Sequence, residues 1–372
     1  MKKITVETLT PVHIGSGRMI SGNAEYLYFP LENALVLIDE TKILELIGTA
    51  QLDIWVQYIE EPTESFLDYL YQRKPDLRPP DVAKRIIPLR GRIPKFHQTL
   101  REQMHDGFGR PYIPGSSLKG AIRTALFTSE IRKRYQPESI PQFRLGGKNK
   151  KGQFQFKDQT LQKEVFGNDP NHDWLRLLRI SDCYFDAVTH ATFSETLNEG
   201  RQMHYHLKQS VSQLTEYIPA GAHTTGTLHI QEALQQLAAR RRYFLPQANT
   251  LSYDWLFEQL RTHTTRLLND ELDFFEDAKL PLDCDMLPDH LTEIRAQCKN
   301  LQPNEAIIRL GFGTGYRNMT GNWTKELLTD AQYDELSDAV RHPRYQSLPL
   351  PKSRKVVREG EPLGFIKLTL NN

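Results

Sequence analysis

The sequence predicts an α+β fold for this chain of 372 residues. Segments with strand-like and helix-like patterns alternate irregularly, and several strand pairs are separated by short turns typical of hairpins. We find no repeat of fixed period and no low-complexity tract. This length is long for one domain and comfortable for two, and such a chain can bury a large core without disulfides or metal ions.

Composition narrows the class of protein. The 47 basic and 46 acidic residues give a net charge of +1, so only local clustering of charge can indicate nucleic-acid binding. Cys183, Cys284 and Cys298 have no metal-ligand spacing, and we expect the reduced thiols of a cytosolic protein. No apolar run reaches membrane-spanning length, and the N-terminus lacks the apolar core of a signal peptide. We therefore expect a soluble, cytoplasmic protein.

The chain begins with a strand over residues 4–9, in which Ile4, Val6 and Thr8 share one face. A Gly-Ser-Gly turn follows within residues 13–18. Its two glycines allow the backbone to approach a ligand closely.

The next segment predicts two short strands over residues 26–38 and a helix that Asp39 or Thr41 caps. Residues 51–74 have the apolar spacing of a helix. The proline-rich piece 75–94 is expected to be an irregular surface connector.

A tight turn and a helix start are predicted within residues 111–128. Pro114-Gly115 is a turn dipeptide, and Ser116 or Ser117 is expected to cap the helix. The apolar stripe of this helix consists of Leu118, Ile122 and Leu126.

Lys119 and Arg123 flank that stripe within the first turns of the helix. Free backbone N–H groups and the positive end of the helix dipole would lie beside them, which would make a cradle for a phosphate. The alternative is an ordinary capped helix with two solvated cations, and the sequence leaves both open.

The remaining elements follow from the same periodicities. They are strands over 177–194, 203–218 and 220–231, helices over 232–242 and 255–268, a strand with a glycine-rich loop over 305–321, a helix over 323–340 and a final strand over 363–370.

Three segments are strongly biased in charge. Residues 131–163 carry nine basic side chains against two acidic ones, which predicts either a solvated loop or an electrostatic arm for a phosphate backbone. Residues 270–289 hold eight carboxylates against one lysine, which predicts a solvated acidic surface or a contact surface for another protein. Residues 341–358 contain six Lys or Arg and no carboxylate.

Three elements are candidates for RNA binding. Their glycines and helix start allow backbone N–H groups to reach phosphate oxygens, and their aromatic side chains could stack on bases, at about 1–3 kcal/mol each. Such contacts would read RNA by backbone and shape rather than by sequence. The residues expected to bind RNA are His13, Gly15, Gly17 and Arg18 in the first turn, Ser116, Ser117, Lys119 and Arg123 at the helix start, and Gly311, Phe312, Gly313, Gly315, Tyr316 and Arg317 in the glycine-rich loop.

Four stretches also carry a family resemblance. PGSSLKGAIRTAL (114–126) resembles the motif that opens the first helix of RAMP proteins, the RNA-binding subunits of CRISPR effector complexes. TPVHIGSG (10–17) resembles the end of their first strand, and RLGFGTGYRNMTG (309–321) resembles their glycine-rich loop. PKSRKVVREGEPLGFIKLTL (351–370) is similar to the type III-A subtype that caps the 3′ end of the guide RNA.

This resemblance implies two ferredoxin-like, RRM-like modules with helical insertions. It would divide the chain into an N-terminal module over 1–231 and a helical segment with a divergent module over 232–372. It also implies a role in antiviral defence as a structural subunit of a Csm complex, which caps the guide RNA (crRNA) and supports its 3′-end maturation. The implied partners are crRNA, the backbone RAMP subunit, the small subunit and a host exoribonuclease, with no cofactor and no membrane.

Two enzymatic alternatives stay open. His13 could act as acid or base in a RAMP-type endoribonuclease that cuts crRNA precursors, or a metal-dependent site could trim RNA. His204 and His206 would share a face of a strand, but no nearby Cys, Asp or Glu completes a metal site. Asp106 precedes a glycine and is a turn former. Because no Gly-x4-Gly-Lys-Ser/Thr, HExxH or GxSxG motif is present, we expect a non-catalytic subunit.

Overall fold

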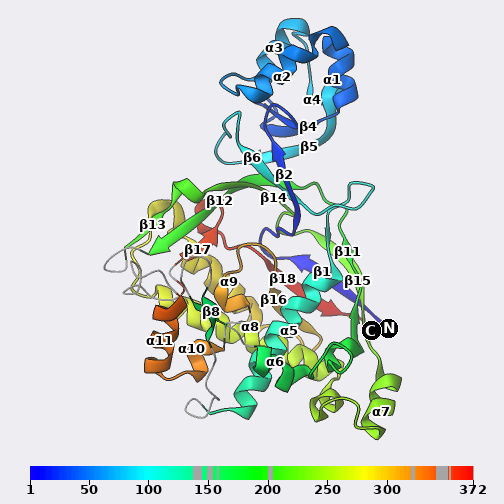
Figure 1. Cartoon of the computed structure of the whole chain (residues 1–372), viewed down its shortest axis with the longest axis vertical. Helices are drawn as coiled ribbons and strands as arrows, with labels where there is room; N and C mark the ends of the chain where they lie inside the picture. Colours follow the sequence, from blue (N-terminus) through cyan, green and yellow to red (C-terminus); the bar gives the residue numbers. More distant parts are fainter. Residues whose placement is uncertain are drawn as a thin grey trace.

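The computed structural model confirms the α+β prediction, with strands and helices gathered around two main sheets (Figure 1). The structure describes residues 1–136, 145–148, 154–156, 159–199, 204–319, 323–340, 351 and 353–371. Among these residues, no helix is both long enough and apolar enough to cross a bilayer. All three cysteines are buried and free.

The smaller main sheet has five strands and joins the two ends of the chain. Its order is β10 (Leu178–Ile180), β15 (His223–Ile230), β1 (Lys2–Thr8), β18 (Phe365–Leu370) and β16 (Glu305–Arg309). Strand β1 lies in the centre and pairs antiparallel with both neighbours, so that Ile4 is opposite Gly226 on one side and Leu370 on the other. The N- and C-termini consequently lie close together (Figure 1).

Strands from both sides of residue 231 therefore share one sheet. The division of the chain at this residue stays a prediction.

Helices cover this sheet and enclose the main core. The helices are α5 (Gly115–Arg134), α6 (Gln159–Phe166), α7 (Glu232–Arg240), α8 (Tyr253–Phe275), α9 (Leu287–Lys299), α10 (Thr324–Leu327) and α11 (Asp330–Val340). The predicted apolar stripe of Leu118, Ile122 and Leu126 is buried, and it packs in one cluster with Ile4 of β1 and Phe257 of α8. Burying such a stripe supplies most of the stability of a surface helix.

The larger sheet has nine strands, seven of them on one path. Its order is β2 (Gly15–Ser21), β6 (Thr99–Gln103), β14 (Gln213–Tyr217), β12 (His190–Glu199), β5 (Ala83–Arg90), β4 (Ala34–Ile38) and β3 (Tyr26–Phe29), with β13 (Tyr205–Leu207) and β17 (Ser353–Val356) also paired with β12. Strand β2 is therefore an edge strand that pairs only with β6 among the described strands. Two short ladders, β7 (Tyr112–Ile113) with β11 (Cys183–Tyr184) and β8 (Leu145–Lys148) with β9 (Phe154–Phe156), complete the described strands.

A helical lobe lies at one end of the molecule (Figure 1). It contains α1 (Glu40–Ile47), α2 (Leu52–Glu60), α3 (Phe66–Arg73) and α4 (Pro79–Val82), and its core packs on β3 and β4. Asp39 caps α1 as predicted. The single helix expected over 51–74 is wrong, because Pro62 interrupts it and Ser65 caps a new helix, α3. The connector expected over 75–94 is also wrong in part, since it contains α4 and β5.

Candidate nucleic-acid interface

The first turn and the glycine-rich loop meet, although almost 300 residues separate them in the sequence. The backbone N–H of Phe312 donates to the carbonyl oxygen of His13 at 2.9 Å, and the two rings make an edge-to-face contact at 5.5 Å. Gly311 makes this approach possible. Its φ is +86°, and a Cβ there would lie 2.6 Å from the same carbonyl oxygen.

His13 is a buried support of this junction. Its Nδ1 lies 2.5 Å from the carbonyl oxygen of Glu216 on β14, and its side chain is 0% exposed. Burial lowers the pKa of His13 to about 4, assisted by the positive charge of Arg101, so the ring is neutral at pH 7. The ring therefore orders the backbone around it and is not exposed to a ligand in solvent.

Phe312 is flanked by two cations. The guanidinium of Arg101 on β6 lies 4.7 Å from the centre of its ring, and the Lys355 ammonium on β17 lies 5.7 Å from it. All three side chains are partly exposed. We call Phe312, Arg101 and Lys355 the phenylalanine cluster. It combines a face on which a base can stack with two charges that attract phosphate.

The sequence analysis assigned no role to Arg101 or Lys355. Lys355 belongs to the basic stretch before the final strand, but nothing in that stretch distinguishes Lys355 from its basic neighbours. Arg101 had no local signal, because only the pairing of β6 between β2 and β14 brings it to the glycine-rich loop.

The first turn exposes its backbone at the edge of the larger sheet. Gly15 and Gly17 are exposed, and Gly17 has a φ of +92° with no atom within 4 Å of the place of a Cβ. The pairing of β2 with β6 is irregular between Gly15 and Met19, as at a β-bulge. Arg18 is exposed and pairs with Glu25 at 2.8 Å. Two exposed glycines and one cation, which Glu25 already pairs, therefore lie at this edge of the sheet.

The predicted helix start is organised differently. Pro114 rather than Ser116 or Ser117 is the N-cap of α5, so that prediction is wrong. The N–H of Gly115 donates to the Asp182 carboxylate at 2.8 Å, so an anion of the chain itself already lies where a phosphate was expected. Ser116 is exposed and Ser117 is partly buried.

The two cations of this helix also bind within the protein. The Lys119 ammonium donates to the Leu178 carbonyl oxygen at 2.8 Å, and burial lowers the pKa of Lys119. Arg123 pairs with Asp173 at 2.6 Å and lies over the Phe166 ring. Both side chains hold α5 to the segment around β10. Their predicted contact with RNA stays a prediction, and these interactions compete with it.

The rest of the glycine-rich loop is exposed at Gly315 and buried at Arg317. Gly313 and Gly315 have φ values of +83° and +76°, and Gly315 is exposed with open space beside it. The Tyr316 hydroxyl lies 3.3 Å from that of Thr324. Arg317 is buried, where its guanidinium lies 3.4 Å from the Glu271 carboxylate.

Arg317 belongs to a buried ion cluster beneath the loop. Arg354 binds both carboxylate oxygens of Glu271, at 2.5 and 2.9 Å. Burial raises the pKa of Glu271, but Arg354 and Arg317 outweigh this effect and hold the pKa below its usual range. Arg317 thus anchors the end of the loop inside the protein rather than presenting its charge to a ligand.

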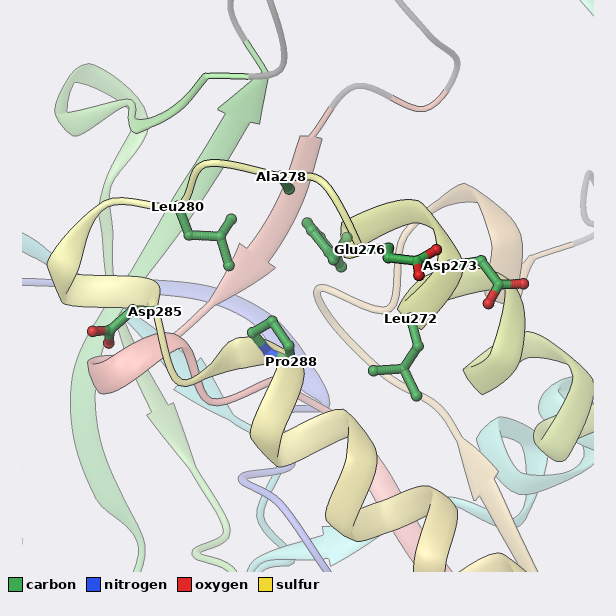
Figure 2. A pocket seen from close by; sticks show the side chains of 8 residues that line it. Leu272, Asp273, Glu276, Ala278, Leu280, Asp285 and Pro288 are labelled. Carbon is green, nitrogen blue, oxygen red and sulfur yellow. The ribbon is translucent and has the colours of Figure 1, made fainter.

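The structure describes two of the three charge-biased segments only in part. Residues 137–144, 149–153 and 157–158 of the basic stretch 131–163, and residues 341–350 and 352 of the basic stretch 341–358, lie outside the described residues. The acidic segment 270–289 spans the end of α8 and the start of α9. It surrounds a pocket of about 540 Å³, in which Asp273, Glu276 and Asp285 lie around an apolar lining that includes Leu272 and Pro288 (Figure 2).

In the part of the chain that the structure describes, no three His, Cys, Asp or Glu side chains are placed to hold a metal ion. His204 lies next to Lys279 in an isolated bridge. The interface offers exposed glycine backbone, the three cations Arg18, Arg101 and Lys355, and the aromatic face of Phe312.

Comparisons with known proteins show which family this chain resembles. The sequence model of the RAMP superfamily matches residues 5–333. The CRISPR system Cms protein Csm5 of Enterococcus italicus is 26% identical over 147 residues, which are 33% of this chain and 42% of that protein. Its namesake in Mycobacterium tuberculosis is 28% identical over 207 residues, 48% of this chain and 54% of that protein. The matched region thus spans about half the length of these relatives.

Solved structures show the same fold. A chain in the cryo-EM structure of a type III-A Csm–crRNA–target RNA ternary complex superimposes with a TM-score of 0.72 over 100% of both chains, at 19% identity. The crystal structure of T. onnurineus Csm5 has a TM-score of 0.68 over 97% of this chain and 99% of that one, also at 19% identity.

Proposed function

Because the chain belongs to the RAMP superfamily, we propose that it is an RNA-binding structural subunit of a type III-A CRISPR (Csm) effector complex. The observation that carries this proposal is the junction of the first turn with the glycine-rich loop around Phe312. It joins exposed backbone donors to a stacking face between two cations, which is the chemistry that binds unpaired RNA without reading its sequence.

The proposed position is the 3′ end of the crRNA, where the subunit caps the filament of backbone subunits and supports maturation of that end. The similarity of two curated relatives named Csm5 supports this choice within the superfamily. The backbone RAMP subunit and crRNA are the proposed direct partners, and the small subunit and a host exoribonuclease are further ones. Such a complex would act in the cytoplasm.

The proposed RNA path runs over the edge of β2 and the glycine-rich loop. Gly15, Gly17 and Gly315 would offer backbone N–H groups, and Arg18 would add a cation at the rim. The phenylalanine cluster would hold one base and its phosphates. His13 and Arg317 would not contact the RNA but would keep the turn and the loop in place.

The subunit is proposed to be non-catalytic. A general base must be within reach of the proton that it takes. His13 is 0% exposed and has a pKa of about 4, which argues against the endoribonuclease alternative. If His13 were catalytic, the purified chain would cut crRNA precursors in EDTA and His13→Ala would abolish the cleavage. A metal-dependent site would instead require divalent cations.

The test is native mass spectrometry of the tagged protein purified from its own host, with sequencing of the RNA that it carries. We expect a multi-subunit assembly that contains repeat-derived guides. A lone chain without guide RNA would refute the proposal. Arg18→Ala combined with Lys355→Ala should reduce the RNA recovered and the slope of binding against salt, since each phosphate contact adds about one unit to that slope. Lys42→Ala combined with Lys299→Ala, which removes two lysines outside this path, serves as the matched control.

A further inference from the structure

A second cavity begins at the same turn as the proposed RNA path. It has a volume of about 540 Å³ and lies among β2, β4, β5, β6 and the turn at residues 105–109. Ser16 and Arg18 of the first turn form part of its lining. A chain of nucleotides that follows the edge of β2 would therefore pass its mouth.

The cavity has an apolar wall and an aromatic rim. Ile20, Leu37 and Ile38 line it and are buried in the fold. Phe108 stands at the rim with 90% of its surface exposed, which is unusual for a phenylalanine. A cavity that combines apolar lining residues with an exposed ring suits a flat aromatic ligand.

The turn that carries Phe108 is well ordered. The Asp106 carboxylate accepts hydrogen bonds from the N–H groups of Phe108 and Arg110, at 3.0 and 2.9 Å. Arg110 also forms an ion pair with Asp106, and Gly109 supplies the φ of +82° that closes the turn. Because these bonds fix the backbone of the turn, the chain loses little backbone freedom when the exposed ring stacks on a ligand.

A carboxylate inside the cavity is held for a ligand. Glu102 accepts from the Ser16 hydroxyl at 2.8 Å and lies 3.6 Å from the Arg85 guanidinium. Arg85 is fixed in turn by Glu216, which is fully buried, at 2.9 Å. A carboxylate has about four acceptor positions, so Glu102 retains capacity for a pair of donors. Arg18 lies on the same lining, where one nitrogen of its guanidinium pairs with Glu25 at 2.8 Å and its other N–H groups are the donors that a ligand would use.

We propose that this cavity receives one guanine base of the RNA that the protein binds. Guanine has two adjacent donors on its pairing edge, which a single carboxylate can accept, and two acceptors on its other edge, which an arginine can contact. Glu102 would take the first edge, Arg18 the second, and Phe108 would stack on the ring. Adenine lacks the paired donors and is excluded on this chemistry. The inference rests on the proposed function and adds a base preference to it.

The experiment is ultraviolet cross-linking with mass spectrometry on the assembly purified from its host. We expect a guanine nucleotide on the peptide that contains Phe108. Phe108→Ala should reduce this cross-link about fivefold or more, since a stacking contact is lost. Glu102→Gln keeps the size of the side chain, and it should lower the share of guanine to its share in the bound RNA. Phe96→Ala, an exposed phenylalanine that does not line the cavity, is the matched control.

The outcomes separate the inference from the function on which it rests. An assembly that carries crRNA but has no nucleotide on this peptide, or that keeps its guanine share in Glu102→Gln, would overturn the cavity while the proposed function stands. An assembly without RNA would overturn both. Addition of GMP should leave the cross-link unchanged, because neighbouring nucleotides hold the base in place. Displacement by GMP would assign the cavity to a free nucleotide and overturn the inference.

Discussion

Phe312→Ala tests the phenylalanine cluster directly. The substitution removes an edge-to-face contact with His13 and two cation–π contacts, with Arg101 and Lys355. These contacts together are worth about 2–3 kcal/mol of folding free energy. If a base of the RNA stacks on the same ring, the substitution should also weaken RNA binding by about 1–3 kcal/mol, or roughly 5- to 150-fold in affinity.

The two effects are measured separately. Urea unfolding reports the change in stability, and fluorescence anisotropy with a labelled single-stranded RNA reports the affinity at a fixed salt concentration. Tyr243→Ala is the matched control, because Tyr243 also stacks on a histidine, His172, and is 43% exposed. We expect this variant to lose stability and keep its affinity. Phe312→Ala with unchanged affinity would refute the stacking role of the cluster.

Three further predictions follow from the same geometry. Gly311→Ala should destabilise the protein more than Gly17→Ala in urea unfolding, because both introduce strain at positive φ, about 1–2 kcal/mol, but only the first would contact a backbone oxygen; equal losses would contradict the close approach at the loop. Lys119→Ala with Arg123→Ala should lower the melting temperature and leave the salt slope of RNA binding unchanged, since both cations bind within the protein. A smaller slope would show that these side chains contact RNA. The free energy of unfolding should fall as the pH drops from about 6.5 towards 4, because the unfolded chain binds a proton on His13 more readily than the folded chain does. The loss should reach up to about 3 kcal/mol. A His13→Gln variant that keeps the full pH dependence in urea titrations would exclude this group as a cause.

Local patterns predicted much of the fold. The apolar spacing within 111–128 identified the buried face of α5, and strand signals near both termini identified β1 and β18. The pairing of these two strands was not predictable, because it joins residues more than 350 positions apart and has no local signature. Helix ends were also missed where tertiary contacts decide them, as at Gly115, which packs against the Ile180 carbonyl and donates to Asp182.

The candidate interface shows the same limit. Gly17, Gly311, Gly313 and Gly315 have positive φ, so the presence of glycine at these positions of the sequence was informative. Charge was not informative in the same way. Arg317 and Lys119 looked like ligand-binding cations, yet partners from distant segments, Glu271 and Leu178, bind them inside the protein. The position of Arg101 beside the loop could not be predicted from the sequence, because it depends on the order of the strands.

Sequencing the 3′ ends of guide RNA in the host tests the central proposal most directly. The host is compared with a strain that lacks this chain and with strains that carry Phe312→Ala or the control Tyr243→Ala. We predict that loss of the chain changes the length distribution of the crRNA 3′ ends while the 5′ ends stay the same, and that Phe312→Ala shifts the distribution in the same direction. Identical 3′ ends in the presence and absence of the chain would contradict the assignment to that end of the guide.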